Sequence, residues 1–403
     1  MDQLPSDVLH RVASMLPLAD CLRASSTCKR MRAEMLGGCS DPTLVHLPLG
    51  LSEGWSYSKR EGFRAFLHRY PHTVAGVSAT VRTPADVPYL DALYRGLAGP
   101  PRLSLVLPGG DCVAYLATTV LVRSFAFAPH VRTITVDYLR PTAGWQNVSG
   151  TWAVAAALLR SLASFPGLEH FVLRTSLGEP QPDGPGALPL RTPLPPSLRT
   201  FQFLVSGGSP LSVHIAQSLP DRLESLSLYQ LTPLMVTALP RLGHLTQLST
   251  GGRVDGVALR LLFDKTPALR VLDCSASGAG YHALHVTGHD ALADVVPPPG
   301  LRRLVLSLPA WTAGDHAPLL DHDYEDVCLQ FEAGDDFEVD TVAVDNLHRL
   351  RCHTCTVTAM GVNVMLGDLA LWDGPISLSI RTDFTGSVVV QQPPPCMLIA
   401  STL

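Results

Sequence analysis

The chain has 403 residues, of which 46% are apolar and 16% are charged, and its formal net charge is −5 at pH 7. This composition indicates a globular protein with a hydrophobic core rather than a disordered chain. The negative charge and the lack of a basic stripe argue against nucleic-acid binding. No apolar run reaches the roughly 18 residues that a membrane span needs. Nine cysteines without a framework spacing, and no visible secretory signal, predict a reducing compartment, cytoplasmic or nuclear.

The first predicted elements are three short helices in the stretch LPSDVLHRVASMLPLADCLRASSTCKRM, residues 4–31. Ser6, Asp20 and Thr27 are residue types that cap helix N-termini. Pro17 ends the first helix because its ring brings no N–H. A unit of this size cannot enclose a core of its own. Its apolar face must therefore be covered either by the rest of the chain or by another protein.

The same stretch resembles the F-box, with an LP pair, an aliphatic helix, a second LPL turn with an acidic residue, and a Cys-Lys-Arg ending. The matching residues are Leu4, Pro5, Val8, Leu9, Leu16, Pro17, Leu18, Asp20, Leu22, Arg23, Cys28, Lys29 and Arg30. The departure is Met31, where many members of the family have Trp. The resemblance implies binding to the small Skp-type adaptor of cullin–RING ubiquitin ligases. The implied adaptor-binding residues are Leu4, Pro5, Leu9, Pro17, Leu18 and Leu22.

Residues 1–36 are accordingly predicted to form an F-box-like helical unit, and residues 37–55 a linker. The periodicity of the opening stretch is also compatible with an ordinary helical cap on the domain that follows. That alternative involves no adaptor and no ubiquitin ligase.

A short phrase that begins with proline and continues with alternating apolar residues then recurs along the chain. It occurs as PGLEHFVL (166–173), PSLRTFQF (196–203), PDRLESLSL (220–228), PALRVLDC (267–274) and PGLRRLVL (299–306), with weaker copies at 71–79, 101–107, 130–136 and 240–248. Its first aliphatic residue lies at Leu168, Leu198, Leu223, Leu242, Leu269 and Leu301, at intervals of 19 to 32 residues. Such periods are typical of stacked units of one strand and one helix. Each phrase predicts a strand, and stretches such as 153–164 and 254–265 predict helices.

The phrase resembles the leucine-rich repeat, whose L-x-x-L-x-L frame is present as Leu301, Leu304 and Leu306. Where that family favours Asn or Cys, this chain has Ser176, Ser206, Ser277, Leu231 and Pro309. The expected fold is therefore α/β, with an irregular leucine-rich-repeat-like solenoid over 56–309. Beyond it, alternating runs such as TVAV predict a strand-rich continuation or cap over 310–403. A Pro/Gly-rich loop is predicted at 177–197.

Three stretches were considered for catalysis or metal binding. His282, His285 and His289 occur at helix-compatible steps beside Asp290, and imidazoles on one helical face could bind zinc. Gly288 would break that helix, so surface or core histidines are the simpler interpretation. Cys352 and Cys355 have CxxC spacing but no second pair nearby, which favours cysteines in a strand. The acidic run 321–326 lacks the spacing and the glycine of a calcium loop.

The function expected from these resemblances is that of a substrate-receptor subunit. The opening helices would bind a Skp-type adaptor and through it a cullin, while the concave strand face would bind an unknown target protein. The chain would not be an enzyme and would need no cofactor. The alternatives are a leucine-rich-repeat-like scaffold without a ubiquitin role and a metal-dependent hydrolase built on the histidine cluster.

Lysine is scarce, since it occurs only at Lys29, Lys59 and Lys265, whereas arginine is frequent. A GC-rich gene explains this bias directly. A ligase subunit that avoids its own modification would show the same bias.

Overall fold

The computed structural model divides the chain into two compact units, Met1–Leu173 and Arg174–Leu403. It describes residues 46–50, 61, 62, 64, 65, 67, 68, 76–97, 100–108, 110–138, 148–175, 193–205, 210–273, 284–287, 295–308, 319, 321–332, 341–344, 350–360, 362–367, 377–382, 387–390 and 398–402. Both units are mixed α/β structures with parallel strands and few helices. The expected helical unit 1–36 lies outside the described residues.

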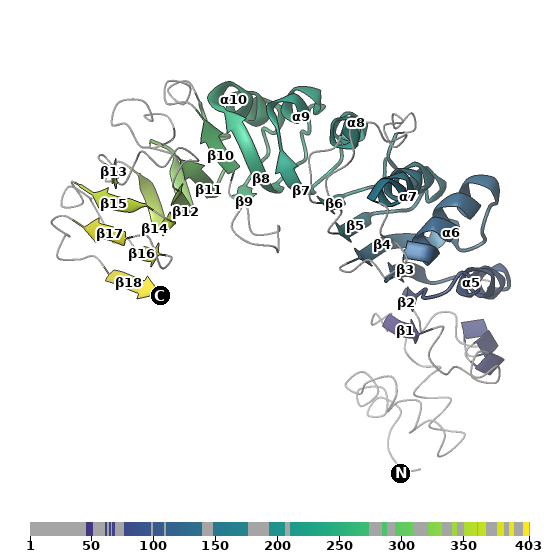
Figure 1. The fold of residues 1–403 in the computed structure, drawn as a ribbon. Coiled ribbons are helices and arrows are strands. Elements are labelled where there is room, and N and C mark those ends of the chain that lie inside the picture. The colour runs from purple at the N-terminus through teal and green to yellow at the C-terminus, as the bar shows by residue number, and fades with distance from the viewer. Residues whose placement is uncertain are drawn as a thin grey trace, which may run out of the picture. The chain divides into compact units, whose positions relative to one another are not determined.

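The first unit has parallel strands with helices on one face of the sheet (Figure 1). Its strands, in sheet order, are β1 His46–Gly50, β2 Gly76–Thr80, β3 Arg102–Leu107, β4 Val131–Tyr138 and β5 His170–Thr175. Its helices are α5 Asp86–Arg95, α6 Gly110–Val122 and α7 Val148–Ser161, with short 3-10 turns at Ala128–His130 and Leu162–Ser164. Along β3, Leu103, Leu105 and Leu107 are buried, as a strand with one inward face requires.

The second unit begins with the same alternation of strands and helices. Its first strands are β6 Thr200–Val205, β7 Ser225–Leu231, β8 Gln247–Asp255, β9 Val271–Asp273, β10 Leu284–Thr287 and β11 Arg303–Leu308. Its helices are α8 Pro210–Ser218, α9 Pro233–Ala238 and α10 Gly256–Lys265, which lie on one face of β6, β7 and β8 (Figure 1). β9 and β10 both pair with β8 and β11, so together they fill one place in the sheet.

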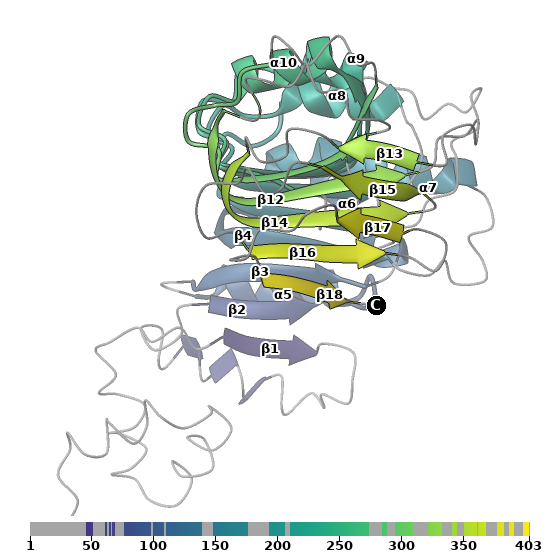
Figure 2. The same ribbon diagram turned by 90° about the vertical axis from the view of Figure 1, so that its left-hand side faces the viewer.

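The sheet continues past residue 309, where long strands alternate with short strands of a second sheet. The long strands are β12 Asp323–Glu332, β14 Arg351–Met360, β16 Ser377–Thr382 and β18 Leu398–Thr402. The segments that connect these strands in the sequence contribute to a second parallel sheet. It is made of β13 Thr341–Val344, β15 Asn363–Leu366 and β17 Ser387–Val390 (Figure 2). Each strand of this second sheet has four residues.

In the second unit, backbone hydrogen bonds join each phrase to the next one just before their strands begin. The carbonyl of Arg199 accepts hydrogen bonds from the backbone N–H groups of Glu224 and Ser225 at 2.8 and 3.0 Å. The same forked contact recurs at the carbonyls of Glu224, Thr246, Arg270 and Arg302. These forked contacts hold the first residues of neighbouring parallel strands in register.

Every strand that the phrases predict is present. The phrase at 299–306 leads into β11, and Leu301, Leu304 and Leu306 are all buried. The prediction of helices at 153–164 and 254–265 is also confirmed, although α7 begins earlier, at Val148. Most of the predicted loop 177–197 lies outside the described residues.

One expectation is corrected. The expected linker 37–55 contains β1, which pairs with β2 in register from His46–Gly76 to Gly50–Thr80, so residues 46–50 belong to the sheet. The helical alternative for the histidine cluster, which Gly288 already disfavoured, does not form at Leu284–Thr287, because these residues are strand β10 between β8 and β11. Pairing with two neighbouring strands determines the conformation of this segment, although the three- and four-residue spacing of the histidines also fits a helix.

One glycine is required by the second unit. Gly252 has φ +113°, where side chains are strongly disfavoured, and it lies at the register shift between β7 and β8. A Cβ there would lie 2.7 Å from the backbone nitrogen of Leu231. Among the described residues, no helix combines the length and the apolar character needed to span a bilayer.

Candidate protein-interaction surfaces

The six residues implied in adaptor binding, Leu4, Pro5, Leu9, Pro17, Leu18 and Leu22, all lie outside the described residues. The structure therefore provides no geometry for them. The described chain offers a second kind of surface, on the strands of the second unit.

We call this surface the helix-free face, which comprises the side chains of the second unit that alternate with the buried apolar row of its strands. The apolar row runs through Phe201, Leu226, Leu248, Leu272, Leu304, Val327, Cys355 and Leu378, which are aligned by strand pairing. The next residue of each strand points to the other side of the sheet. That row is Gln202, Ser227, Ser249, Asp273, Val305, Cys328, Thr356 and Ser379. The helix-free face is thus mainly small and polar, and four members of the row, Ser227, Ser249, Asp273 and Val305, are buried.

A charged cluster interrupts this polar surface at Arg303. Its Nη1 atom lies 3.4 Å from Oδ2 of Asp273, and its Nε atom lies 3.2 Å from Oδ2 of Asp326. The Asp273 side chain is only 7% exposed, whereas that of Arg303 is 45% exposed. The guanidinium is therefore held by two carboxylates while part of it still faces solvent. A fixed, half-exposed guanidinium is well suited to bind a carboxylate or a carbonyl of another protein.

Next to this cluster, Cys328 contacts the hydroxyl of Thr358 and lies near Arg381. Burial raises the pKa of the Cys328 thiol, so it remains protonated near neutral pH. Gln330, two residues along β12, is 8% exposed, and its Oε1 atom is buried without a hydrogen-bond partner. A buried amide oxygen in that state costs stability, and it is not accessible to another protein.

The alternative sites considered from the sequence are not assembled in the described residues. Cys352 and Cys355 lie in β14 as free thiols, as the strand interpretation predicts. A hydrogen bond with Cys352, together with burial, raises the pKa of Cys355 well above its ordinary value, which opposes thiolate chemistry. In the part of the chain that the structure describes, no three His, Cys, Asp or Glu side chains are grouped to bind a metal. His282, His289 and Asp290 lie outside that part.

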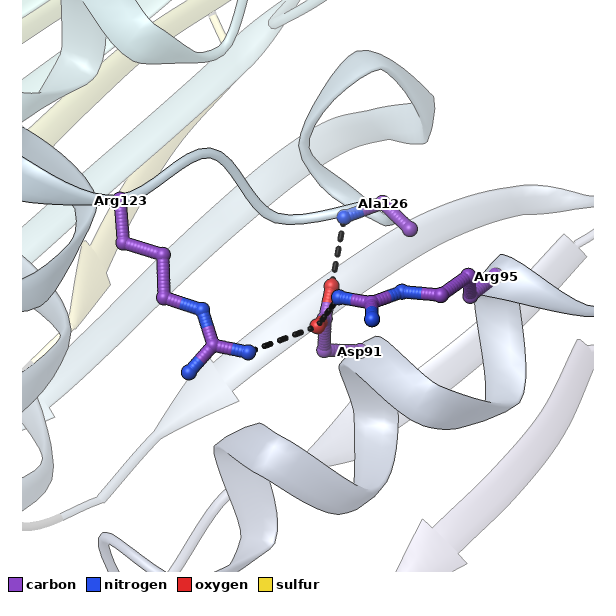
Figure 3. A network of polar contacts seen from close by, with 4 residues as sticks. All are labelled: Asp91, Arg95, Arg123 and Ala126. Carbon is purple, nitrogen blue, oxygen red and sulfur yellow. Dashed lines mark hydrogen bonds and ion pairs between the residues drawn. The ribbon is translucent and has the colours of Figure 1, made fainter.

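In the first unit, a buried carboxylate joins separate segments. Asp91 of α5 accepts hydrogen bonds from the Arg95 guanidinium at 2.6 Å and from the Arg123 guanidinium at 3.4 Å, and its other oxygen accepts from the Ala126 N–H at 2.6 Å (Figure 3). The Asp91 side chain is 3% exposed. All its contacts are internal, so this cluster stabilises the fold rather than presenting a binding group.

Sequence reasoning did not identify the Arg303 cluster. Its members come from three separate strands, and only the register of the sheet brings them together. A signal existed, because Asp273 and Arg303 occupy polar alternation positions within two of the phrases.

Comparison with known proteins gives one result for the opening stretch. Residues 1–34 match the family model described as F-box-like. No curated protein matches the chain. The matched range covers the residues on which the sequence resemblance rests, so this comparison supports the likeness of the opening stretch to the F-box.

Proposed function

We propose that the chain is a substrate-receptor subunit of a cullin–RING ubiquitin ligase, acting in the reducing cytoplasm or nucleus. The match of residues 1–34 to the F-box-like family carries this proposal. Leu4, Pro5, Leu9, Pro17, Leu18 and Leu22 would form the adaptor-binding face. The chain would have no catalytic residues of its own. It would act by holding a target near a ubiquitin-charged conjugating enzyme, which raises the effective concentration of the target.

The rest of the chain is proposed to be an irregular leucine-rich-repeat-like solenoid. Parallel strands in both units, helices on one face, and the buried Leu301, Leu304 and Leu306 of the frame support this assignment. The second sheet, made of the short strands β13, β15 and β17, makes it irregular.

The target is proposed to bind the helix-free face at the Arg303 cluster. Arg303 supplies a guanidinium that is held by two carboxylates while its side chain remains 45% exposed. This arrangement favours a polar protein segment over an apolar one.

Direct binding to a purified Skp-type adaptor tests the proposal. The double variant Leu9→Asp with Leu18→Asp places two charges on the proposed apolar face, and the affinity should fall at least about a hundredfold. The matched control is Leu234→Asp, because this leucine of α9 is 65% exposed and its change should leave the affinity unaltered. Circular dichroism verifies that each variant is folded. Equal affinity of the wild type and the folded double variant would contradict the adaptor assignment.

The alternative function is a protein-binding scaffold without a ubiquitin role, in which the opening helices cap the first unit. In that case Leu9 and Leu18 would be covered by the chain itself. The double variant would then unfold the first unit, and the wild type would bind no adaptor.

A further inference from the structure

The contacts of Lys265 bear on whether the lysines of this chain can be acylated. The sequence has three lysines, Lys29, Lys59 and Lys265, and only the last belongs to the described residues. Lys265 is the final residue of α10, and α10 packs beside α9.

The ammonium group of Lys265 is bound at the C-terminal end of α9. Nζ donates hydrogen bonds to the carbonyl oxygens of Val236 at 3.0 Å, Thr237 at 2.7 Å and Leu239 at 2.6 Å. An ammonium has three protons, so all of them are used. The last carbonyls of a helix lack partners within the helix, and a cation there also interacts favourably with the helix dipole. Lys265 therefore serves as the C-terminal cap of its neighbouring helix.

We propose that this contact withholds Lys265 from acylation, and that modification of this chain by ubiquitin is confined to Lys29 and Lys59. The second part rests on the proposed ligase function. Transfer requires a neutral amine to attack the thioester carbonyl of a ubiquitin-charged conjugating enzyme. The isopeptide C–N bond forms while the C–S bond breaks, the thiol leaves with one proton, and the ammonium's remaining excess proton passes to solvent.

At Lys265 this reaction is slowed by the geometry of the three hydrogen bonds. An amine lone pair at Nζ would point at one of three carbonyl oxygens, and turning it toward a thioester requires breaking the contacts with α9. Burial lowers the pKa of Lys265, but loss of a proton leaves two N–H groups still bound to carbonyls. Removing one charge-assisted hydrogen bond already slows such a reaction by about tenfold.

Exposed cations elsewhere in the second unit are arginines. Arg199 pairs with Glu224 at 3.0 Å, and Arg302 pairs with Glu325 at 2.8 Å, and both arginine side chains are 59% exposed. A guanidinium is not an acceptor for a ubiquitin thioester. Lysine at either position would retain the ion pair and add an accessible acceptor. Arg302→Lys therefore creates a reference amine in the same unit as Lys265.

Chemical acetylation of the native full chain tests the first part without a ligase. An amine-reactive acetyl ester is added to the Arg302→Lys variant, and mass spectrometry follows each site. Lys265 should react about tenfold or more slowly than the installed lysine. The difference should vanish in denaturant. Equal rates in the native protein would overturn the protection of Lys265.

Ubiquitin transfer in a ligase reconstituted with adaptor, cullin, RING protein and conjugating enzyme tests the second part. Modification should map to Lys29 and Lys59 in the wild type and additionally to the installed lysine in Arg302→Lys. The Lys29→Arg and Lys59→Arg double variant should receive no ubiquitin on a lysine. Ubiquitin on Lys265 of the native chain would overturn the inference. Failure to assemble the ligase would instead count against the proposed function, while the acetylation rates would still decide the state of Lys265.

Discussion

Oδ1 of Asp91 accepts a hydrogen bond from the backbone N–H of Ala126 at 2.6 Å, which joins α5 to the segment that follows α6. The two residues are 35 positions apart in the sequence. Arg95 and Arg123 also contact this carboxylate, but their side chains are largely solvated. The stabilising part of the cluster is therefore the buried hydrogen bond.

The first prediction concerns Asp91. Replacing it with alanine leaves the N–H of Ala126 without its acceptor and should lower the free energy of unfolding by about 1–3 kcal/mol. The control Arg95→Ala removes only a partly exposed ion pair and should cost less than about 1 kcal/mol. Urea denaturation measures both. Equal effects of the two variants would show that the ion pair, not the backbone contact, stabilises this unit.

The second prediction concerns the left-handed backbone at Gly252. Gly252→Ala should lower the free energy of unfolding by about 1–3 kcal/mol, because φ is +113° and a Cβ meets the backbone of Leu231. At Gly243 an added Cβ meets nothing within 4 Å, so Gly243→Ala should change stability by less than about 1 kcal/mol. Thermal unfolding compares them. A Gly252→Ala variant as stable as the wild type would contradict the left-handed backbone at Gly252.

The third prediction is a pH dependence in the first unit. Burial, and then the charge of Arg132, lower the pKa of His130 below its ordinary value. The unfolded chain therefore binds more protons at this site, and stability is lost as pH falls below about 6.5. His130→Gln should reduce this acid loss. Unfolding measured at pH 5.5 and pH 8 checks the sign, and an unchanged pH dependence in the variant would contradict it.

The fourth prediction separates two neighbouring arginines of the second unit. Arg303→Ala removes the guanidinium held between Asp273 and Asp326, so it should weaken binding to a target of the helix-free face by about tenfold or more. Arg302→Ala removes only an exposed pair with Glu325 and should leave target binding within about twofold. Once a target has been identified, its affinity for both variants provides the measurement. Similar losses for the two would place the target elsewhere.

Much of the sheet could be predicted from the sequence because each strand carries its own local signal. In the phrase PGLRRLVL, proline and alternating leucines indicate both where β11 begins and which face is buried. β10 could not be predicted in this way. Its four residues, LHVT, lie among histidines whose spacing also fits a helix, and its strand conformation depends on its neighbours β8 and β11.

The two candidate surfaces also differ in whether a local sequence signal identifies them. The resemblance of residues 4–31 is local, and the family match to residues 1–34 agrees with it. The Arg303 cluster depends on strand pairing between distant segments, since Asp273 and Asp326 approach Arg303 only when β9, β11 and β12 are in register. A single sequence does not contain that register.

The central claim is that this chain joins a cullin–RING ligase through its opening helices. Quantitative affinity purification of the tagged full chain, followed by mass spectrometry, measures this most directly when the wild type is compared with the Leu9→Asp and Leu18→Asp double variant. The wild type should recover a Skp-type adaptor and a cullin in near-equal amounts, and the folded double variant should lose both together. Recovery of the folded wild type with neither protein would contradict the claim.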